Sequence, residues 1–171
     1  MVIKPHTDMQ VFIDLVENNP DKHFDFNAAG AVIEAPPKRI HSYIQALLAR
    51  LLPILDGYQI LTECAHLLGD WPCRPDVSID AKGDEPIPTT APLLAVEIKS
   101  DRNTYKDQRE KARKYIAHGT AMVWLIFPEK RLVEIYQPNA DDQILTEDNT
   151  IDGGNVLPGF TLAVKTIFES I

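Results

Sequence analysis

The sequence predicts an α/β sandwich in which helices flank a central mixed β-sheet, and three observations lead to this fold class. Residues 40–55 and 104–118 are amphipathic at helical spacing, so each can lie along one face of a sheet. Short apolar, β-branched runs such as residues 93–100 have the composition of strands. Strands and helices alternate imperfectly along the chain, which favours a mixed sheet. The 171 residues are most simply a single domain, 1–171, with one buried core.

The N-terminal half is expected to hold two helices with short strands between them. The predicted elements are a helix that begins at Thr7 and Asp8 and ends before Asn18, strands at 24–27 and 31–34, a helix at 40–55 and a strand at 58–67. Pro20 and the pair at 36–37 interrupt the chain between these elements, because proline cannot continue a helix or a strand ladder.

The C-terminal half begins with strands and continues with a second strong helix. The predicted elements are strands at 74–80 and 93–100 separated by a Pro- and Gly-rich loop, a helix at 104–118 closed by Gly119, and a hairpin of strands at 121–127 and 132–136. Residues 141–171 are expected to form a loop with short strands and a terminal helical turn.

Two charged residues share one face of the apolar strand at 93–100. Because side chains alternate along a strand, Glu97 and Lys99 point to the same side, together with Ala95. Buried charges are unfavourable unless they pair or bind a metal, so this face indicates a site. The alternative is an exposed strand in which Glu-x-Lys occurs by chance.

The motif RPDVSID at 74–80 supplies a second carboxylate. If this strand lies beside the one at 93–100, Asp76 and Glu97 can share one Mg²⁺ or Mn²⁺ ion, since both cations prefer oxygen ligands. The ammonium of Lys99 would then face the same cation and could stabilise charge on a phosphate. A Pro-Asp pair is also common in turns, which is the alternative for Asp76.

The charge is distributed unevenly along the chain. The formal net charge of −8 argues against a protein that coats DNA nonspecifically, because phosphate binding depends on Lys and Arg. Residues 99–114, however, hold seven basic and three acidic residues. Such a segment is either a solvated helix face with ion pairs or a surface that faces phosphate.

Cysteine content and hydropathy limit the location of the protein. The two cysteines, Cys64 and Cys73, give no disulfide framework and suit a reducing compartment. Together with His66 they match no standard zinc spacing, so core thiols are favoured. The chain shows no signal-peptide pattern and no stretch that approaches a membrane span, and we expect a cytoplasmic protein.

At this point the sequence resembles a known family. RPDVSID, EIKS, KARKYIAHGTAMVWLIFPEKRLVEIYQP and LPGFTL follow one another as in the Uma-type restriction endonucleases of the PD-(D/E)XK nuclease superfamily. The upstream stretch GAVIEAPPKRIHSYIQALLARL is also similar to the N-terminal pattern of that family. The resemblance covers residues 29–168 and implies a restriction-endonuclease-like fold. Lys99, which many relatives replace, is kept, and this favours an intact catalytic centre.

The resemblance also implies roles for residues outside the two strands. Glu34 is similar to an acidic residue that approaches the metal, although a surface carboxylate remains the alternative. Asp76 and Glu97 correspond to the metal ligands and Lys99 to the catalytic lysine. On the second helix, three residues at i, i+3 and i+7 share a face and would support the site or contact substrate: Gln108, Lys111 and Tyr115.

The alternatives for that helix are a core Tyr115 and a solvated Lys111. His41 could approach the site from the first core helix, but a capping or surface histidine is favoured. The expected function is a Mg²⁺- or Mn²⁺-dependent endonuclease with DNA as its substrate, alone or as a homodimer. The alternative is a catalytically silent nucleic-acid-binding or protein-interaction module, or a mobile-element protein whose partner presents the substrate.

Overall fold

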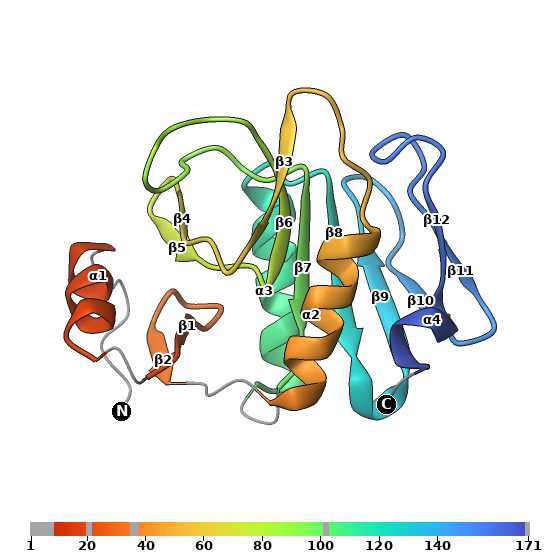
Figure 1. Cartoon of the computed structure of the whole chain (residues 1–171), viewed down its shortest axis with the longest axis horizontal. Helices are drawn as coiled ribbons and strands as arrows, with labels where there is room; N and C mark the ends of the chain where they lie inside the picture. Colours follow the sequence, from red (N-terminus) through yellow and green to blue (C-terminus); the bar gives the residue numbers. More distant parts are fainter. Residues whose placement is uncertain (1–8, 20–21, 35–37, 101–102, 170–171) are drawn as a thin grey trace.

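A six-stranded mixed sheet forms the centre of the protein, as a computed structural model describes it for residues 9–19, 22–34, 38–100 and 103–169 (Figure 1). Its strands are β3 (Tyr58–Thr62), β6 (Val77–Ala81), β7 (Leu94–Ile98), β8 (Met122–Phe127), β9 (Leu132–Tyr136) and β10 (Gln143–Thr146). Helices lie against this sheet, so the predicted fold class, an α/β sandwich with a mixed sheet, is confirmed.

The strands follow the spatial order β10-β9-β8-β7-β6-β3. β7 and β8 run parallel, and the other neighbouring strands of this sheet pair antiparallel. A parallel pair needs a crossover connection, which helix α3 (Tyr105–Ala117) provides. This crossover places α3 directly after the strand that contains Glu97.

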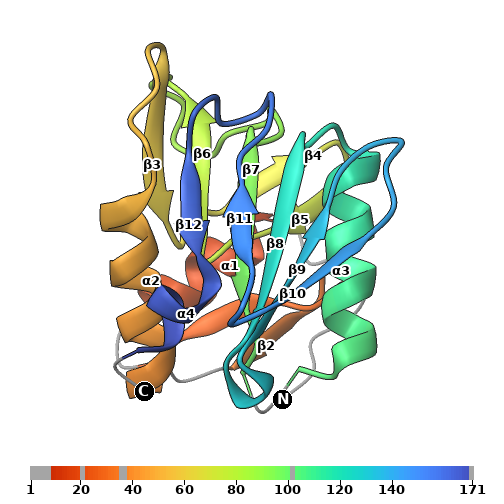
Figure 2. The same ribbon diagram turned by 90° about the vertical axis from the view of Figure 1, so that its right-hand side faces the viewer.

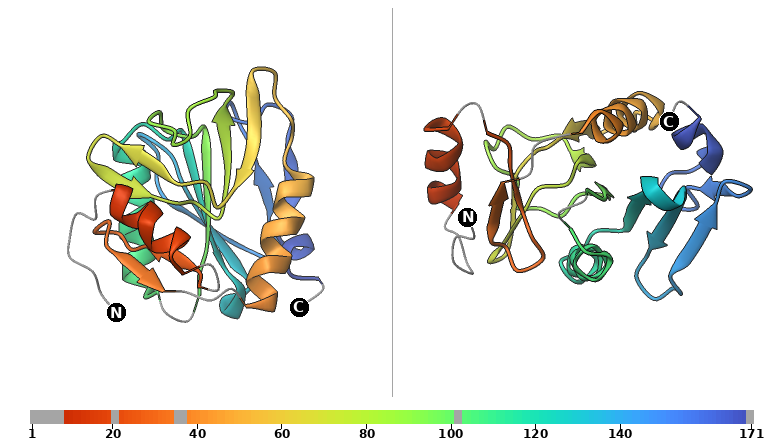
Figure 3. Two further views of the ribbon diagram at one scale, coloured as in Figure 1. Left: turned by 60° about the vertical axis from the view of Figure 1, so that its left-hand side comes forward. Right: turned by 90° about the horizontal axis from the view of Figure 1, so that it is seen from below.

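Two helices lie on opposite faces of the sheet (Figures 2 and 3). Helix α2 (Arg39–Leu51) and the short α4 (Val164–Phe168) cover the face that presents Val77, Val96 and Trp124. Helix α3 covers the other face, where the buried side chains include Ala95, Leu125 and Tyr115. Alternation along β7 therefore sends Leu94, Val96 and Ile98 into the core under α2, and Ala95 and Glu97 into the layer under α3.

The ends of the two long helices have simple causes. α2 was expected to reach residue 55 but ends at Leu51, because Pro53 forces Leu52 into an extended conformation with ψ 143°. α3 begins after Thr104, whose hydroxyl accepts a hydrogen bond from the Asp107 amide. It ends at Ala117, and Gly119, two residues further on, has a φ of 104°, in the region that favours glycine.

The predicted strand at 58–67 is wrong in its second half. Backbone φ at Glu63 is 51°, which ends β3 and turns the chain away from the central sheet. The following residues form a separate hairpin of β4 (His66–Leu68) and β5 (Trp71–Cys73). The predicted strand at 74–80 likewise begins later, at Val77.

The N-terminal segment forms a small layer beside the main sheet (Figure 1). It consists of α1 (Met9–Glu17) and the antiparallel pair β1 (Phe24–Phe26) and β2 (Val32–Glu34), which share their own apolar cluster. The predicted helix start at residues 7–8 lies outside the described residues. At the C-terminal end, β11 (Thr150–Asp152) and β12 (Thr161–Ala163) form a third two-stranded antiparallel pair, in the region where short strands were expected. Within the described ranges, no helix is long and apolar enough to cross a membrane.

Candidate active site

Asp76 lies at the end of the sheet where β6 begins. Its backbone amide donates to the carbonyl oxygen of Val96 in β7, so the antiparallel pairing brings it beside the end of that strand. The Asp76 carboxylate accepts a 2.6 Å hydrogen bond from the Ile98 amide through Oδ2, and Oδ1 lies 3.1 Å from His41 Nε2. Burial raises the pKa of Asp76, but His41, Lys111 and the Ile98 amide hold it below its usual value on balance. The carboxylate is therefore held in its charged form.

Glu97 is almost completely buried, with 2% of its surface exposed. Lys111 Nζ lies 2.8 Å from its Oε2, and the Tyr115 hydroxyl donates a 2.9 Å hydrogen bond to its Oε1. Burial raises the pKa of Glu97 to about 8; repulsion from Asp76 and Asp25 adds to this effect, and the Lys111 ammonium opposes it. Burial is thus the main cause of this rise, and the two neighbouring carboxylates add to it.

The inner face of α3 completes this layer. Three of its residues are buried there: Gln108, Lys111 and Tyr115. The alternative prediction, that Lys111 is exposed to solvent, is therefore wrong. Burial lowers the pKa of Lys111, but nearby Asp25 and Glu97 raise it well above its usual range on balance. The amide nitrogen and oxygen of Gln108 are buried without a hydrogen-bond partner, which is unusual for buried polar atoms.

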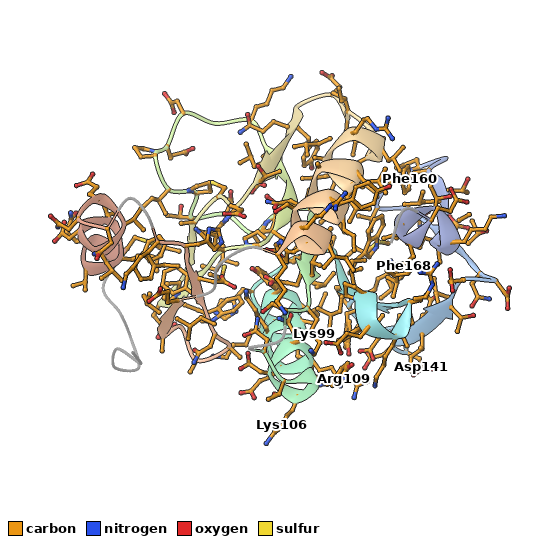
Figure 4. All side chains as sticks on the ribbon, turned by 60° about the horizontal axis from the view of Figure 1, so that its bottom comes forward. Lys99, Lys106, Arg109, Asp141, Phe160 and Phe168 are labelled. Carbon is orange, nitrogen blue, oxygen red and sulfur yellow. The ribbon has the colours of Figure 1, made fainter. Side chains whose placement is uncertain are left out.

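Lys99 follows Glu97 on the same strand, but its ammonium contacts other groups. Nζ lies 3.2 Å from the carbonyl oxygen of Ser100, 3.5 Å from Glu129 Oε1 and 4.9 Å from the centre of the Tyr105 ring. Figure 4 shows Lys99 near the start of α3. The structure therefore brings Asp76, Glu97 and the buried face of α3 together. The Lys99 ammonium, which was expected to face the same site, contacts Glu129 and Tyr105.

Glu34 lies at the end of β2 and forms a 3.3 Å ion pair with Lys22. Both side chains are substantially exposed, so this pair contributes little to stability. The ion pair with Lys22 lies at the surface. Binding of a cation by Glu34 together with Asp76 and Glu97 therefore stays a prediction.

Two residues at the site were not selected from the sequence. His41 was interpreted as a surface or capping residue, but it is largely buried and its contact with Asp76 outweighs burial to raise its pKa. The sequence pattern that could have indicated His41 is its spacing from Gln45, since two polar residues at i and i+4 share one face of an otherwise apolar helix. Both contact Asp76, and Gln45 donates a 3.0 Å hydrogen bond to its carbonyl oxygen. Asp25, placed between Phe24 and Phe26 on β1, carried no comparable signal.

The donor set suits a cation that needs few protein ligands. Among the residues described, no three His, Cys, Asp or Glu side chains converge as a ready metal cluster. Mg²⁺ keeps several waters and binds through one or two carboxylates plus substrate phosphate, so Asp76 and Glu97 are sufficient donors. Burial is the main cause of the raised Glu97 pKa, and the repulsion from Asp76 and Asp25 that adds to it also favours an added cation. The residues present therefore fit Mg²⁺ or Mn²⁺.

Comparisons with known proteins agree with this architecture. A family model described as "Uma2: Putative restriction endonuclease" matches residues 9–165. A solved structure described as "a putative nuclease belonging to DUF820 from Anabaena variabilis" has a TM-score of 0.72 and 22% sequence identity, and the match covers 81% of this chain and 86% of that one. At this identity the likeness shows the fold alone. No curated protein matches the chain. Because the family model spans most of its length, the chain belongs to the Uma2 restriction endonuclease family.

Proposed function

We propose that this protein is a Mg²⁺- or Mn²⁺-dependent endonuclease that hydrolyses phosphodiester bonds in DNA. The observation that carries the proposal is the position of two buried carboxylates, Asp76 and Glu97, at one end of adjacent strands, where the charge of Asp76 adds to the effect of burial on the Glu97 pKa. Buried acidic groups with displaced pKa values cluster at functional sites. Family membership supports nuclease chemistry for this chain.

Asp76 and Glu97 would hold the cation, which when bound supplies a Lewis acid and lowers the pKa of nearby water. The protein's own groups orient these ligands. The Ile98 amide and His41 fix the Asp76 carboxylate, and Tyr115 fixes Glu97 through its hydroxyl. Such supporting hydrogen bonds hold a carboxylate in one orientation, so less ordering is needed when a cation binds.

Lys99 would bring positive charge to the substrate phosphate, as its place two residues after Glu97 suggests. Its resting partner Glu129 has 54% of its side chain exposed, and ion pairs with such groups are weak. A phosphodiester group also carries a negative charge and accepts charge-assisted hydrogen bonds, so it can draw the long Lys99 side chain away from this weakly held partner. The ammonium would then stabilise negative charge that develops during hydrolysis.

One observation favours a second function, a catalytically silent nucleic-acid-binding module. In the resting structure Lys99 contacts Glu129 and Tyr105 instead of either candidate metal ligand. If that arrangement persisted on DNA, the protein would bind nucleic acid without turnover. The two functions differ in whether cleavage depends on Lys99 and on the carboxylates.

A nuclease assay on plasmid and single-stranded DNA with Mg²⁺, Mn²⁺ or EDTA tests the proposal. We expect cleavage in Mg²⁺ or Mn²⁺, none in EDTA, and none by Glu97→Ala. DNA binding measured by fluorescence anisotropy in Ca²⁺ should persist in Lys99→Ala. Binding without cleavage by the unaltered protein under every condition would support the silent module and contradict the nuclease.

A further inference from the structure

Asp25 places a third carboxylate against the buried face of α3. Its Oδ1 lies 3.6 Å from Lys111 Nζ and also accepts a 2.7 Å hydrogen bond from the Phe26 amide. The Asp25 side chain is 14% exposed and that of Lys111 only 1% exposed. One enclosed ammonium therefore lies between two carboxylates, at 2.8 Å from Glu97 and at 3.6 Å from Asp25.

This arrangement creates a competition on Glu97. Tyr115 already donates to Oε1 of Glu97, and Lys111 donates to Oε2. A divalent cation on Glu97 would take over its negative charge and repel the adjacent ammonium, because like charges interact strongly in a poorly solvated site. The ammonium cannot reach bulk water from its enclosed position, and a buried charge without a partner is strongly unfavourable.

Asp25 provides the partner that this situation requires. At 3.6 Å its carboxylate is within ion-pair distance but too far for a direct hydrogen bond, so a small rotation of the flexible Lys111 side chain closes the contact. The carboxylate is fixed by the Phe26 amide and belongs to β1, a different layer from the two candidate metal ligands. It can therefore accept the ammonium without moving Asp76 or Glu97.

We infer that Asp25 is a positioning residue that receives Lys111 when Glu97 takes up the cation. The inference rests on the proposed function. The ammonium exchanges one carboxylate for another inside the protein, and no proton or covalent bond is transferred. Asp25 thereby sets the affinity of the site for the cation, although it does not touch the cation itself.

Calorimetric titration with Mn²⁺ tests the exchange, with activity not needed as a readout. Asp25→Asn should weaken Mn²⁺ binding by about tenfold, because Lys111 then has only Glu97 as a charged partner. Lys111→Met should strengthen binding by removing the competitor. Asp25→Glu should restore affinity to within about twofold of the unaltered protein, since a carboxylate is again within reach of Lys111.

The double variant shows whether Asp25 acts by receiving Lys111 or by direct attraction between its charge and the cation. If Asp25 acts through Lys111, Asp25→Asn should change Mn²⁺ affinity by less than about twofold in the Lys111→Met background. If its charge acts directly on the cation, the tenfold loss would persist there and overturn the inference. Asp142→Asn is the matched control, because this carboxylate pairs with the exposed Arg113.

The remaining outcomes separate this inference from the proposed function. If Asp25→Asn fails to fold, Asp25→Ser has the same expectation, because its hydroxyl can still accept the Phe26 amide bond. Normal Mn²⁺ affinity in the folded Asp25 variant would refute the exchange and leave the metal centre intact. An absence of Mn²⁺ binding by the unaltered protein would refute the metal centre itself, and the exchange with it.

Discussion

The backbone amide of Ile98 donates a 2.6 Å hydrogen bond to Asp76 Oδ2, so the carboxylate that precedes β6 is attached to the last residue of β7. This bond joins the two adjacent strands at the point where both candidate metal ligands lie. It also holds Asp76 in its charged form, because a hydrogen bond to a carboxylate lowers its pKa.

Asp76→Asn should affect metal binding and stability together. We expect Mn²⁺ affinity to fall by more than about 100-fold, because one of two carboxylate ligands loses its charge. In EDTA the variant should also lose about 2 kcal/mol of unfolding free energy, since the Ile98 amide and His41 lose a charged acceptor. Titration calorimetry and urea unfolding measure the two effects.

Glu97→Gln provides the comparison for that variant. It should lose metal affinity to a similar extent, because the second ligand is neutralised. Unchanged Mn²⁺ affinity in both variants would show that the cation binds elsewhere.

Lys99→Ala should separate binding from cleavage. We expect cleavage to fall by about 100-fold or more, because a charge that stabilises the reacting phosphate is removed, while Mn²⁺ affinity stays unchanged. Lys130→Ala is the matched control, since its ammonium lies over the same Tyr105 ring at 3.8 Å. Equal losses of activity in the two variants would show that the positive charge of both lysines near Tyr105 supports activity and that Lys99 has no special role.

The salt dependence of DNA binding should identify the part of α3 that approaches the phosphate backbone. Lys106 points away from the body of the protein near the start of α3 (Figure 4), whereas Lys111 is enclosed and cannot contact DNA in this conformation. Lys106→Ala should therefore flatten the log–log salt slope by about 0.9 for duplex DNA. Arg113→Ala should leave it unchanged, because Arg113 lies two turns further along and pairs with Asp142. Fluorescence anisotropy in Ca²⁺ at several salt concentrations is the measurement, and a flatter slope for Arg113→Ala would reverse this assignment.

The ion pair of Glu134 and Arg109 should make stability depend on pH at the side of the sheet covered by α3. Burial raises the pKa of Glu134, but hydrogen bonds from Arg109 and Tyr136 lower it on balance. Since the pKa is lower in the folded protein than in the unfolded chain, the stabilisation is present above the unfolded value of about 4.3. It is lost as the pH falls through the folded value.

Glu134→Gln should cost about 2 kcal/mol near neutral pH, and this difference should shrink in acid. Urea unfolding of both proteins at a series of pH values gives the result. A difference that stayed constant down to the acid end would mean that the carboxylate charge contributes nothing.

His66 and Asp80 form a buried pair further along β6, with 2.5 Å between His66 Nε2 and Asp80 Oδ1, and Ser78 donates to the other oxygen of Asp80. Replacing His66 with Ala should destabilise the fold by about 3 kcal/mol, because a buried carboxylate loses its main partner. Mn²⁺ affinity should be unaffected, and thermal unfolding beside calorimetry would check both. A loss of metal binding in a folded His66→Ala protein would extend the site along β6.

Strand alternation predicts which face of its strand Glu97 occupies, because side chains alternate with a period of two. That Asp76 lies beside this strand depends on the pairing of β6 with β7, which the sequence analysis had to assume. The break after Thr62 was not predictable in this way, since the positive φ of Glu63 arises in a turn with no glycine to signal it. The end of α2 could have been predicted from Pro53 and was placed too late. Each difference concerns a local end or turn, while the order of the main elements was correct.

The burial of Lys111 could not be predicted from its neighbours in sequence. Lys111 lies in a helix with several other basic residues, and only docking of α3 onto the sheet selects which of them faces Glu97. The same is true of His41, whose contact with Asp76 depends on how α2 crosses the end of β6. Helix periodicity defines a face, but tertiary packing decides what that face meets.

The separate apolar cluster of the N-terminal layer has a consequence for dynamics. α1, β1 and β2 share an apolar cluster that is separate from the two cores of the central sheet and also includes Ala65, Leu67 and Ile87, so this layer can open at lower free energy than the central sheet unfolds. Detachment removes Asp25 from Lys111 and exposes the buried ammonium to water. The rate of amide hydrogen exchange in β1 and the charge interactions of Glu97 then both report on one opening reaction. A ligand that slows hydrogen exchange in β1 must therefore, by linkage, also change the interactions of Glu97.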